Sequence, residues 1–516
     1  MSCSNAQYVQ KADKEVYAIL KQAEKKVFNK QSNLSIDTKQ SLQSPDKITN
    51  ATLLEKTRQT GSVTFNIEQA LKYSFENSRS YQSQKESLYL TGLSLTDVKD
   101  RFSWAESSRA SATRGRQTDG DQFVTGSTDN GISKILKGGG SISLNIANDL
   151  LKFFTGSSNR SITSAISVNL AQPLLRGRGS DIAAEALTQS HRNVIYQMRS
   201  FNDFQQSFSR DVVIAYLRLS QQEQSIDNEK KNLESRKANY EYLKARSIDR
   251  ASSDEVSDAE QDVFTAETRL INVKANYENA LDNFKILIGM PTSMTLNINR
   301  GDLISIGNAG LVPFRYSQRK AHDIALEHRA DILNEVDQFE DSRRDILLAA
   351  DALKTQLDFV SSASISNSGD KWQRLNFNDI NANIGLELDL PINNKTERNN
   401  YRRSLIRFNA AGRTLNGSHD ALNALIKNRM RQIQQSKNNY EIQLNAVKLA
   451  ERRVEGNELR LKAGNLLFRR LSESQDDLIS ARNAVTDSLV DYQNSRLSLY
   501  VDLGILDVNQ PKFWLK

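Results

Sequence analysis

Few residues of this chain could carry out chemistry, and their spacing is wrong for catalysis. The glycine run at 138–140 lacks the Gly-Lys-Ser/Thr sequence that a phosphate-binding loop needs. Asp476 and Asp477 are adjacent, so on a helix their carboxylates point in different directions and make a poor acid–base pair. No His-Glu-x-x-His motif or other paired-ligand spacing links the four histidines, His191, His322, His328 and His419. The sequence therefore predicts a protein that is not an enzyme and has no cofactor or metal site.

The only cysteine, Cys3, excludes a disulfide framework and a thiolate metal site. It lies in Met-Ser-Cys-Ser-Asn before a polar stretch, which resembles the end of a bacterial lipoprotein signal, where a cysteine follows a small residue. The apolar segment that should precede such a cysteine is absent. Two interpretations stay open: Cys3 is a site of lipid attachment, or it is incidental. The missing signal sequence does not indicate a cytoplasmic protein.

The composition excludes several classes of protein. Of the 516 residues 38% are hydrophobic, and the mean hydropathy is −0.57. No apolar run approaches the ~18 residues of a transmembrane helix, which excludes a helical membrane protein. Apolar periodicity that persists for hundreds of residues argues against disorder. The net charge of +7 is spread over segments of mixed sign, so it does not indicate nucleic-acid binding.

The elements that would position functional residues occur in two copies. Aligning Pro173 with Pro391 (391 − 173 = 218) superposes two alternating apolar segments that each end at the proline. Three blocks match in all: 70–112 with 321–363 at a shift of 251, 163–179 with 381–397 at a shift of 218, and 276–289 with 491–504 at a shift of 215. The excess of 251 − 218 = 33 residues lies between the two strands of the first copy. Each copy is therefore predicted to be helix, strand, loop, strand, long helix, turn and helix.

This repeat gives the expected organisation of the chain, which is mainly α with a small β part. We expect a polar N-terminal extension (1–60), a first repeat (62–291), a linker (292–312), a second repeat (313–508) and a C-terminal tail (509–516). The first repeat would hold strands at about 103–116 and 160–172 and helices at about 180–246 and 253–288. The second would hold strands at about 356–366 and 380–390 and helices at about 395–463 and 468–503.

Both final helices carry a coiled-coil stripe. Residues seven apart are large and apolar in the second copy (Leu471, Leu478, Val485, Tyr492, Leu499) and in the first (Val256, Val263, Leu270, Tyr277, Phe284). Smaller residues follow most of them three positions on, which favours close helix approach. The two long helices also carry apolar stripes with a spacing of seven, in the first copy (Val212, Leu219, Ile226, Leu233, Tyr240) and in the second (Ile433, Tyr440, Val447, Val454, Leu461). These two stripes are related by a shift of 221 residues rather than 218, and nothing in the sequence explains the difference. A solvated coiled-coil rod would account for the helices but not for the strands.

The predicted strands have one apolar and one polar face. In 381–390, Ile384, Leu386 and Leu388 alternate with Asn383, Glu387 and Asp389. Each strand is about ten residues long, enough to cross a bilayer when tilted. Four strands cannot close a barrel, and an open edge in hydrocarbon leaves backbone groups without hydrogen bonds. If the strands lie in a membrane, three chains would supply twelve strands, and the helices would continue below them as a cylinder.

At this point the sequence resembles the TolC family of outer-membrane efflux channels. The residues that carry the resemblance are Gln-Pro-Leu-Leu-Arg-Gly-Arg-Gly (172–179), Ser-Ser-Asp-Glu-Val-Ser-Asp-Ala-Glu (252–260), Ala-Leu-Asp-Asn-Phe-Lys-Ile-Leu-Ile-Gly-Met-Pro (280–291) and Lys-Ala-Gly-Asn-Leu (462–466). The similarity spans about 62–508. Cys3, outside that span, fits the many family members that are anchored by lipid.

The resemblance implies a homotrimeric conduit. A twelve-stranded barrel would lie in the outer membrane and an α-helical tunnel would cross the periplasm. The tunnel would close at the helical turns and open when a periplasmic adaptor protein and an inner-membrane pump engage it. Transport through the conduit would be passive. Gly464, Asn465 and Leu466 would form the surface that contacts the adaptor.

Members of this family often narrow the tunnel tip with acidic residues just after each turn. The matching positions here are Arg470 and Glu473 in the second copy and Glu255, with Asp258 nearby, in the first. Arg470 departs from the acidic pattern, which puts a cation-binding ring in doubt. Two interpretations remain: Arg469 and Arg470 pair with Glu255 or Asp258 across neighbouring helices and hold the tip shut, or all five are solvated charges at a turn.

Several alternatives stay open at this stage. The cargo could be small toxic compounds, metal ions or a secreted polypeptide. Ser141–Ala147 also alternates, so it is either an extracellular strand or an extension of the barrel within the 33-residue excess. The rival to the channel is a soluble coiled-coil scaffold that binds partners through its helices. The alternating strands and the Gln-Pro junctions between strand and helix argue against this rival.

Overall fold

The computed structural model describes residues 5–30, 34–38, 41, 43–118, 120–155, 160–246, 252–369, 378–463, 465 and 468–515. Cys3 lies outside these residues. The chain forms two compact units. The first, here the sheet unit, comprises Met1–Asn33, Leu88–Met198 and Asn334–Gly417. The second, the helical unit, comprises Leu34–Ser87, Arg199–Leu333 and Ser418–Lys516.

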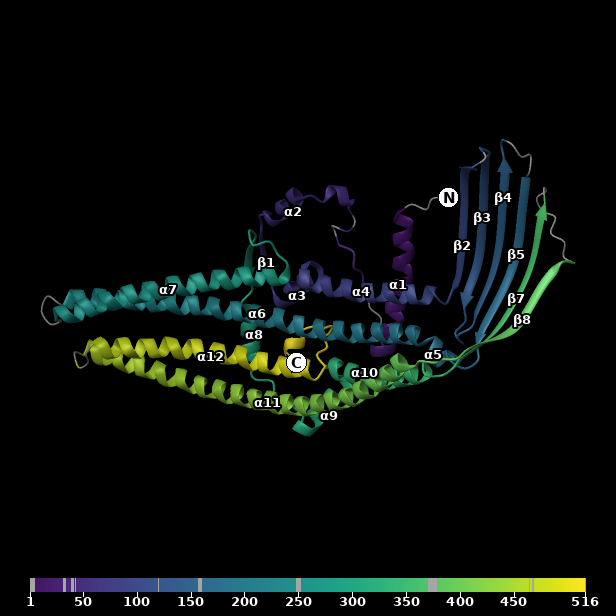
Figure 1. Ribbon diagram of the computed structural model, residues 1–516. Helices are drawn as coiled ribbons and strands as arrows, with labels where there is room; N and C mark the ends of the chain where they lie inside the picture. Colours follow the sequence, from purple (N-terminus) through teal and green to yellow (C-terminus); the bar gives the residue numbers. More distant parts are fainter. Residues whose placement is uncertain are drawn as a thin grey trace. The chain divides into compact units, whose positions relative to one another are not determined.

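The sheet unit is built on six antiparallel strands in the order β2-β3-β4-β5-β7-β8. Figure 1 shows them as one continuous sheet. Their bounds are β2 Trp104–Arg116, β3 Gln122–Ile135, β4 Ser141–Phe153, β5 Arg160–Pro173, β7 Gln356–Gly369 and β8 Ile380–Asp389. The four expected strands are therefore all present, as β2, β5, β7 and β8.

The prediction of four strands per chain was wrong, because the excess residues of the first repeat form a further hairpin inside the sheet. This hairpin, β3–β4, lies between β2 and β5, so β2 pairs with β3 rather than with β5. The alternating segment Ser141–Ala147 is the first part of β4. Nothing in the alternation predicted β3, because Thr128 and Asn130 interrupt its apolar side.

The sheet unit also contains helices. Helix α1 (Asn5–Phe28) begins in the polar N-terminal extension and packs on α4 (Arg79–Asp100), where a side chain on Gly92 would overlap Val16. The Tyr89 hydroxyl donates to Asp13 at 2.6 Å. Helices α5 (Ser180–Ala183) and α10 (Ala330–Asp351) contribute to the same unit.

Four long helices make up most of the rest: α6 (Glu185–Arg246), α7 (Ser253–Ile288), α11 (Lys395–Lys462) and α12 (Phe468–Asp502). The fold is thus mainly helical with a smaller β part, as expected. No helix in the described ranges is both long and apolar enough to cross a lipid bilayer.

Smaller elements surround the middle of the helical unit. They are α2 (Asn50–Thr57), α3 (Ile67–Asn77), α8 (Gly301–Ala309), α9 (Gln318–His328) and the parallel pair β1 (Ser62–Phe65) with β6 (Thr295–Ile298). The segment 292–312, expected as a linker, therefore contains β6 and α8. The hydroxyl of buried Tyr216 on α6 donates to the carbonyl of Phe65, at the end of β1, and accepts from the amide of Asn299, just beyond β6.

An apolar core joins the second repeat's helices in this unit. Tyr492, Leu499 and Leu503 of the last helix segment pack with Leu422, Ile426 and Ile433 of α11 and with Ala321 and Ile324 of α9. Tyr492 and Leu499 belong to the heptad stripe found in the sequence. The stripe is therefore the buried seam, as coiled-coil spacing predicts.

Candidate functional site

The C-terminal ends of α6 and α11 and the N-terminal ends of α7 and α12 lie together at one end of the helical unit, which we call the tip (Figure 1). All four long helices contribute to an apolar cluster there. Leu243 of α6, Ala259 of α7, Leu461 of α11, and Phe468 and Leu471 of α12 are buried together. Of the expected adaptor-contact residues, Gly464 and Leu466 lie outside the described residues. The amide of Asn465 donates to the carbonyl of Arg460 at 2.9 Å and so closes the end of α11.

The acidic candidates of the first repeat lie at the start of α7. Ser252 and Glu255 form a capping box, in which the Ser252 hydroxyl accepts from the Glu255 amide at 3.2 Å and the Glu255 carboxylate accepts from the Ser252 amide at 3.4 Å. Glu255 is therefore held as a helix cap. Asp258 is exposed one turn further on. Neither residue contacts the tip arginines in the described part of a single chain.

The candidates of the second repeat lie on the first turns of α12. Arg469 forms an ion pair with Glu473 four residues later at 3.4 Å, and both side chains are exposed. Arg470 is also exposed, and its carbonyl accepts from the Asn457 side chain at 3.3 Å. Within one chain the structure thus brings Arg469 to Glu473 rather than to Glu255 or Asp258. A lock between neighbouring chains stays a prediction.

The structure adds a residue that the sequence did not single out, Arg236 of α6. Its side chain is only 3% exposed and lies between α7 and α12. The guanidinium donates to Asp262 of α7 at 2.8 Å, to Asp476 of α12 at 2.9 Å and to the Ser472 carbonyl at 3.0 Å. Arg269 of α7 pairs with the same Asp476 at 2.6 Å. Two cations and two carboxylates thus join three helices close to the tip, and we call this group the Arg236 clamp.

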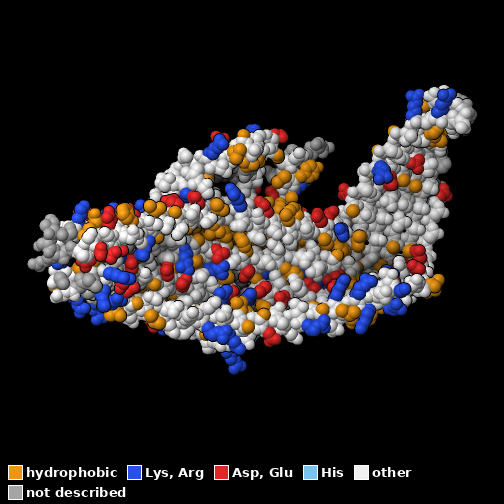
Figure 2. Space-filling model, turned by 60° about the vertical axis from the view of Figure 1, so that its left-hand side comes forward, with side chains coloured by type: hydrophobic (Ala, Val, Ile, Leu, Met, Phe, Trp, Pro, Cys, Tyr) orange, Lys and Arg blue, Asp and Glu red, His pale blue; other side chains and the backbone are white. Residues whose placement is uncertain are grey.

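The clamp continues as a polar ladder along α6 and α12. Asn228 donates to Asn483 at 2.7 Å, and Gln475 donates to Ser235 at 3.0 Å. Further from the tip, Arg218 pairs with Asp491 and Gln221 with Asp487. Figure 2 shows many charged side chains at the tip end of the helical unit. Hydrogen bonds and ion pairs therefore run along the α6–α12 interface, and water can compete for them when the helices separate.

One carboxylate of the ladder, that of Asp487, is not fully stabilised by its surroundings. Burial raises the pKa of the Asp487 carboxyl above its ordinary value, and Asp491 adds to the rise, while Arg218 opposes it. A charged Asp487 therefore weakens this interface in the folded protein. The ladder therefore combines the ion pairs of the Arg236 clamp, near the tip, with a destabilising charge on Asp487, further from the tip.

The sheet has two chemically different faces. The strand register places Ile146 of β4 beside Ile166 of β5, which lies beside Ile365 of β7, and Ile380 of β8 completes the row. The opposite face of the same strands is rich in serine and asparagine, among them Ser143, Ser167, Ser362, Ser364, Asn381 and Asn383. The sheet surface seen in Figure 2 is largely uncharged polar side chains and backbone. The apolar face weakens over β3 and β2, where Thr128 and Ser108 take the same side.

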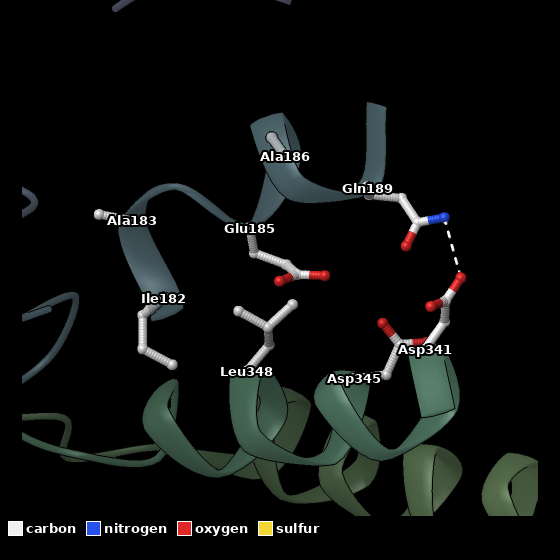
Figure 3. A pocket seen from close by; sticks show the side chains of 8 residues that line it. All are labelled: Ile182, Ala183, Glu185, Ala186, Gln189, Asp341, Asp345 and Leu348. Carbon is white, nitrogen blue, oxygen red and sulfur yellow. Dashed lines mark hydrogen bonds between the residues drawn. The ribbon is translucent and has the colours of Figure 1, made fainter. Parts of the chain in front are cut away.

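A cavity of about 540 Å³ lies in the sheet unit between α6 and α10, near the start of α6. Figure 3 shows Glu185, Gln189 and Asp341 around it, and Gln189 donates to Asp341 at 3.1 Å. Arg344 bridges Glu185 at 2.8 Å and Asp341 at 2.9 Å, so these carboxylates are already neutralised. We interpret the cluster as a structural joint. No group of three or more His, Cys, Asp or Glu residues in the described ranges could hold a metal ion.

Comparison with solved structures identifies the fold. VceC, an outer membrane protein of Vibrio cholerae, matches 85% of this chain and 96% of its own, with 14% identity and a TM-score of 0.62. The open state of the MtrE outer membrane channel of Neisseria gonorrhoeae matches 86% of this chain and 91% of its own, with 13% identity and a TM-score of 0.60. The CmeC outer membrane channel of Campylobacter jejuni matches 85% of each chain, with 14% identity and a TM-score of 0.60.

No protein-family model matches the chain, and no curated protein matches it. At these identities the likeness establishes the fold alone. The fold is that of the outer-membrane channels of the TolC type, which the sequence resemblance predicted.

Proposed function

We propose that this protein is the outer-membrane channel of a tripartite efflux or type I secretion system. The observation that carries the proposal is the sheet, whose strands present one apolar and one polar face and lie in the same chain as the long helices. A face of Ile, Leu and Val side chains exposed to water would be unfavourable, whereas a bilayer would bury it. The polar face would then line an aqueous lumen. Transport would be passive, with energy supplied by an inner-membrane pump through a periplasmic adaptor that contacts Gly464, Asn465 and Leu466.

The proposed assembly is a homotrimer, and the internal repeat supports a specific interface for it. Helix α7 exposes Phe264, Ile271 and Ile286, which are 55%, 66% and 59% accessible. At the shift of 215, Phe264 corresponds to Ile479 and Ile286 to Val501, and both are buried in α12. If α7 packs in the trimer as α12 packs within the chain, its neighbour is α11 of the next copy.

The apolar surface of α11 fits this arrangement. Ile442 and Leu449 of α11 are exposed, and the shift of 221 aligns them with Gln221 and Asn228 of α6. Those two α6 residues belong to the polar ladder on α12. The interface between copies would therefore be apolar where the interface within a copy is polar.

This difference suggests which interface moves. Separating apolar surfaces exposes them to water, whereas a polar ladder can exchange its partners for water. We propose that the tip opens along α6–α12, with the Arg236 clamp as the contact that must break, while α7 and α11 of adjacent copies stay together. The pairing of Arg469 or Arg470 with Glu255 or Asp258 of a neighbouring copy would add to the closed state.

Envelope fractionation followed by size exclusion with light scattering tests the proposal. We expect a detergent-extracted trimer in the outer-membrane fraction that forms pores in planar bilayers. A soluble monomer or dimer would contradict the channel and favour the coiled-coil scaffold. The same fraction tests for lipid on Cys3 by mass spectrometry. Pores that conduct ions but do not respond to an adaptor would support the channel function and contradict the proposed gating.

Substitution of the exposed apolar residues tests the trimer interface. Ile271→Asp should shift the protein from trimer to monomer, because it would bury a charge between α7 and α11 of the next copy. Thr265→Asp is the matched control, because Thr265 and its counterpart Ser480 (265 + 215 = 480) are both exposed. Equal trimer content in the two variants would exclude this interface.

A further inference from the structure

The sheet ends in two edges that no strand of the described chain covers, β2 and β8. Both are long, Trp104–Arg116 and Ile380–Asp389. In a bilayer each edge would leave a row of backbone amides and carbonyls without hydrogen-bond partners. The strand that covers each edge decides how many strands a copy contributes to a barrel, because the inserted β3–β4 hairpin lies between β2 and β5.

The hairpin is part of the sheet. Its register is continuous on both sides: Trp104 to Arg116 of β2 pair with Lys134 to Gln122 of β3, and Ser141 to Lys152 of β4 pair with Ala171 to Arg160 of β5. Strand β4 also continues the apolar face of β5, because Leu144 lies beside Val168 and Ile146 beside Ile166. Cross-strand apolar pairs of this kind stabilise a sheet. Bringing β2 directly against β5 would break both sets of pairs.

The two edges suit each other. All neighbouring strands in the sheet are antiparallel and the sheet has six strands, so β2 and β8 run in opposite directions. Strand β8 of one copy can therefore pair with β2 of the next in the antiparallel arrangement of the rest of the sheet. The side of β2 that continues the apolar face carries Ala110 and Ala112 in its middle, and its charges Glu106 and Arg114 stand towards its ends. Charged residues are tolerated best near the two membrane interfaces.

We propose that each copy contributes all six strands, with the β2 edge paired to the β8 edge of a neighbouring copy. In the trimer of the proposed function, on which this inference rests, the barrel then has 18 strands (3 × 6) rather than twelve. Barrel diameter grows roughly linearly with strand number, so this barrel would be about one and a half times as wide as a twelve-stranded one. Barrels of that size enclose an aqueous channel. The outer-membrane segment is then the wide part of the conduit, and the tip alone limits the size of the cargo.

Disulfide cross-linking tests the edge pairing, and the chain suits this method because Cys3 is its only cysteine. In a Cys3→Ser background, Ser107→Cys or Ser111→Cys in β2 is combined with Asn381→Cys or Asn383→Cys in β8. All four positions lie on the polar face. Within one copy β2 and β8 are roughly 24 Å apart, from five strand spacings of about 4.8 Å, so a disulfide reports contact between copies. The control pairs Ser111→Cys with Ile384→Cys, which lies on the opposite face.

We expect at least one β2–β8 combination to give covalently linked trimers in outer-membrane fractions, and the control to give none. A second panel pairs Asn145→Cys of β4 with the same β8 cysteines, because a twelve-stranded barrel built from β4, β5, β7 and β8 alone would place β4 beside β8 of the next copy. Cross-links in this second panel, or none in the first from a protein that is still a trimer in the outer membrane, would overturn the 18-stranded barrel. A protein that is no trimer at all would instead contradict the proposed function.

Discussion

The first repeat ends α7 at Gly289 and the second ends α12 at Gly504, and the two ends are built alike. Both glycines have positive φ, 79° and 71°, and a side chain on either would overlap a backbone carbonyl, that of Asn77 at 2.1 Å and that of His328 at 2.6 Å. Asn77 and His328 are themselves related by the shift of 251, and the glycines by 215. The repeats thus share the joint where the last helix, α7 or α12, meets the C-terminal end of α3 or α9.

The repeats differ in the number of strands that they contribute to the sheet and in their contacts near the tip. The first contributes four strands to the sheet and the second two. Near the tip, Arg236 of the first repeat is buried in a clamp, whereas its counterpart in the second, Asn457 (236 + 221 = 457), bonds to a single backbone carbonyl. The shared joint belongs to the common scaffold, and the differences lie in the two parts that we propose for the membrane and for the gate. Duplication therefore supplied the frame, and divergence at its ends supplied the specific properties.

The largest expected effect is at the clamp. Arg236→Met removes the buried cation that joins Asp262 to Asp476, and two hydrogen bonds to charged groups are together worth roughly 3–5 kcal/mol. Asn457→Ala, the matched change in the second repeat, should stay within about 0.5 kcal/mol. Thermal unfolding measures both, and bilayer conductance should show leak only for Arg236→Met. If the Arg236→Met pore does not leak, the clamp does not keep the channel closed, even if the variant is less stable.

The shared joint predicts equal behaviour of the two repeats. Gly289→Ala and Gly504→Ala should each destabilise the protein by about 2–5 kcal/mol, because a left-handed conformation costs about 1–2 kcal/mol and overpacking about 1–3. Gly289→Ala should have the larger effect, because its overlap is closer. Gly456→Ala, inside α11 with open space around it, is the control and should stabilise by roughly 0.5–1 kcal/mol. Denaturant titration measures these changes in the free energy of unfolding. Destabilisation by only one of the two joint substitutions would show that the repeats are not equivalent here.

The inserted strand should behave like a strand of the second repeat. Leu144→Arg on the apolar face of β4 and Leu386→Arg on that of β8 each place a cation where lipid is expected, which costs about 2–4 kcal/mol at mid-membrane. Asn145→Arg and Asn383→Arg, on the polar face, are the controls. Heat dissociation of detergent-extracted trimers provides the readout. An effect at Leu386 without one at Leu144 would place β4 outside the membrane.

The sequence predicted those parts of the molecule whose pattern is local. Strand β8 was found because Ile384, Leu386 and Leu388 alternate without interruption, and α12 because its stripe repeats every seven residues. Strand β3 was missed because its residues fit a sheet only once β2 and β4 lie beside it. Arg236 lies three positions after Leu233, on the same helix face as the apolar stripe, but the sequence does not show which carboxylates a buried charge there would meet. Its burial depends on Asp262 and Asp476, which are distant in sequence and belong to other helices.

The smallest effect concerns Asp487, whose counterpart in the first repeat is Asn272 (487 − 215 = 272). The raised pKa means that the folded state binds this proton more tightly than the unfolded state. Stability therefore falls as pH rises from the ordinary carboxyl range through the raised value, and it recovers as pH falls again. Asp487→Asn should raise the melting temperature slightly at neutral pH, and the gain should disappear at low pH, where Asp487 is protonated. Asp491→Asn, at a half-exposed ion pair, is the control and should give no such gain. A gain that persists at low pH would mean that packing, rather than charge, distinguishes the two repeats here.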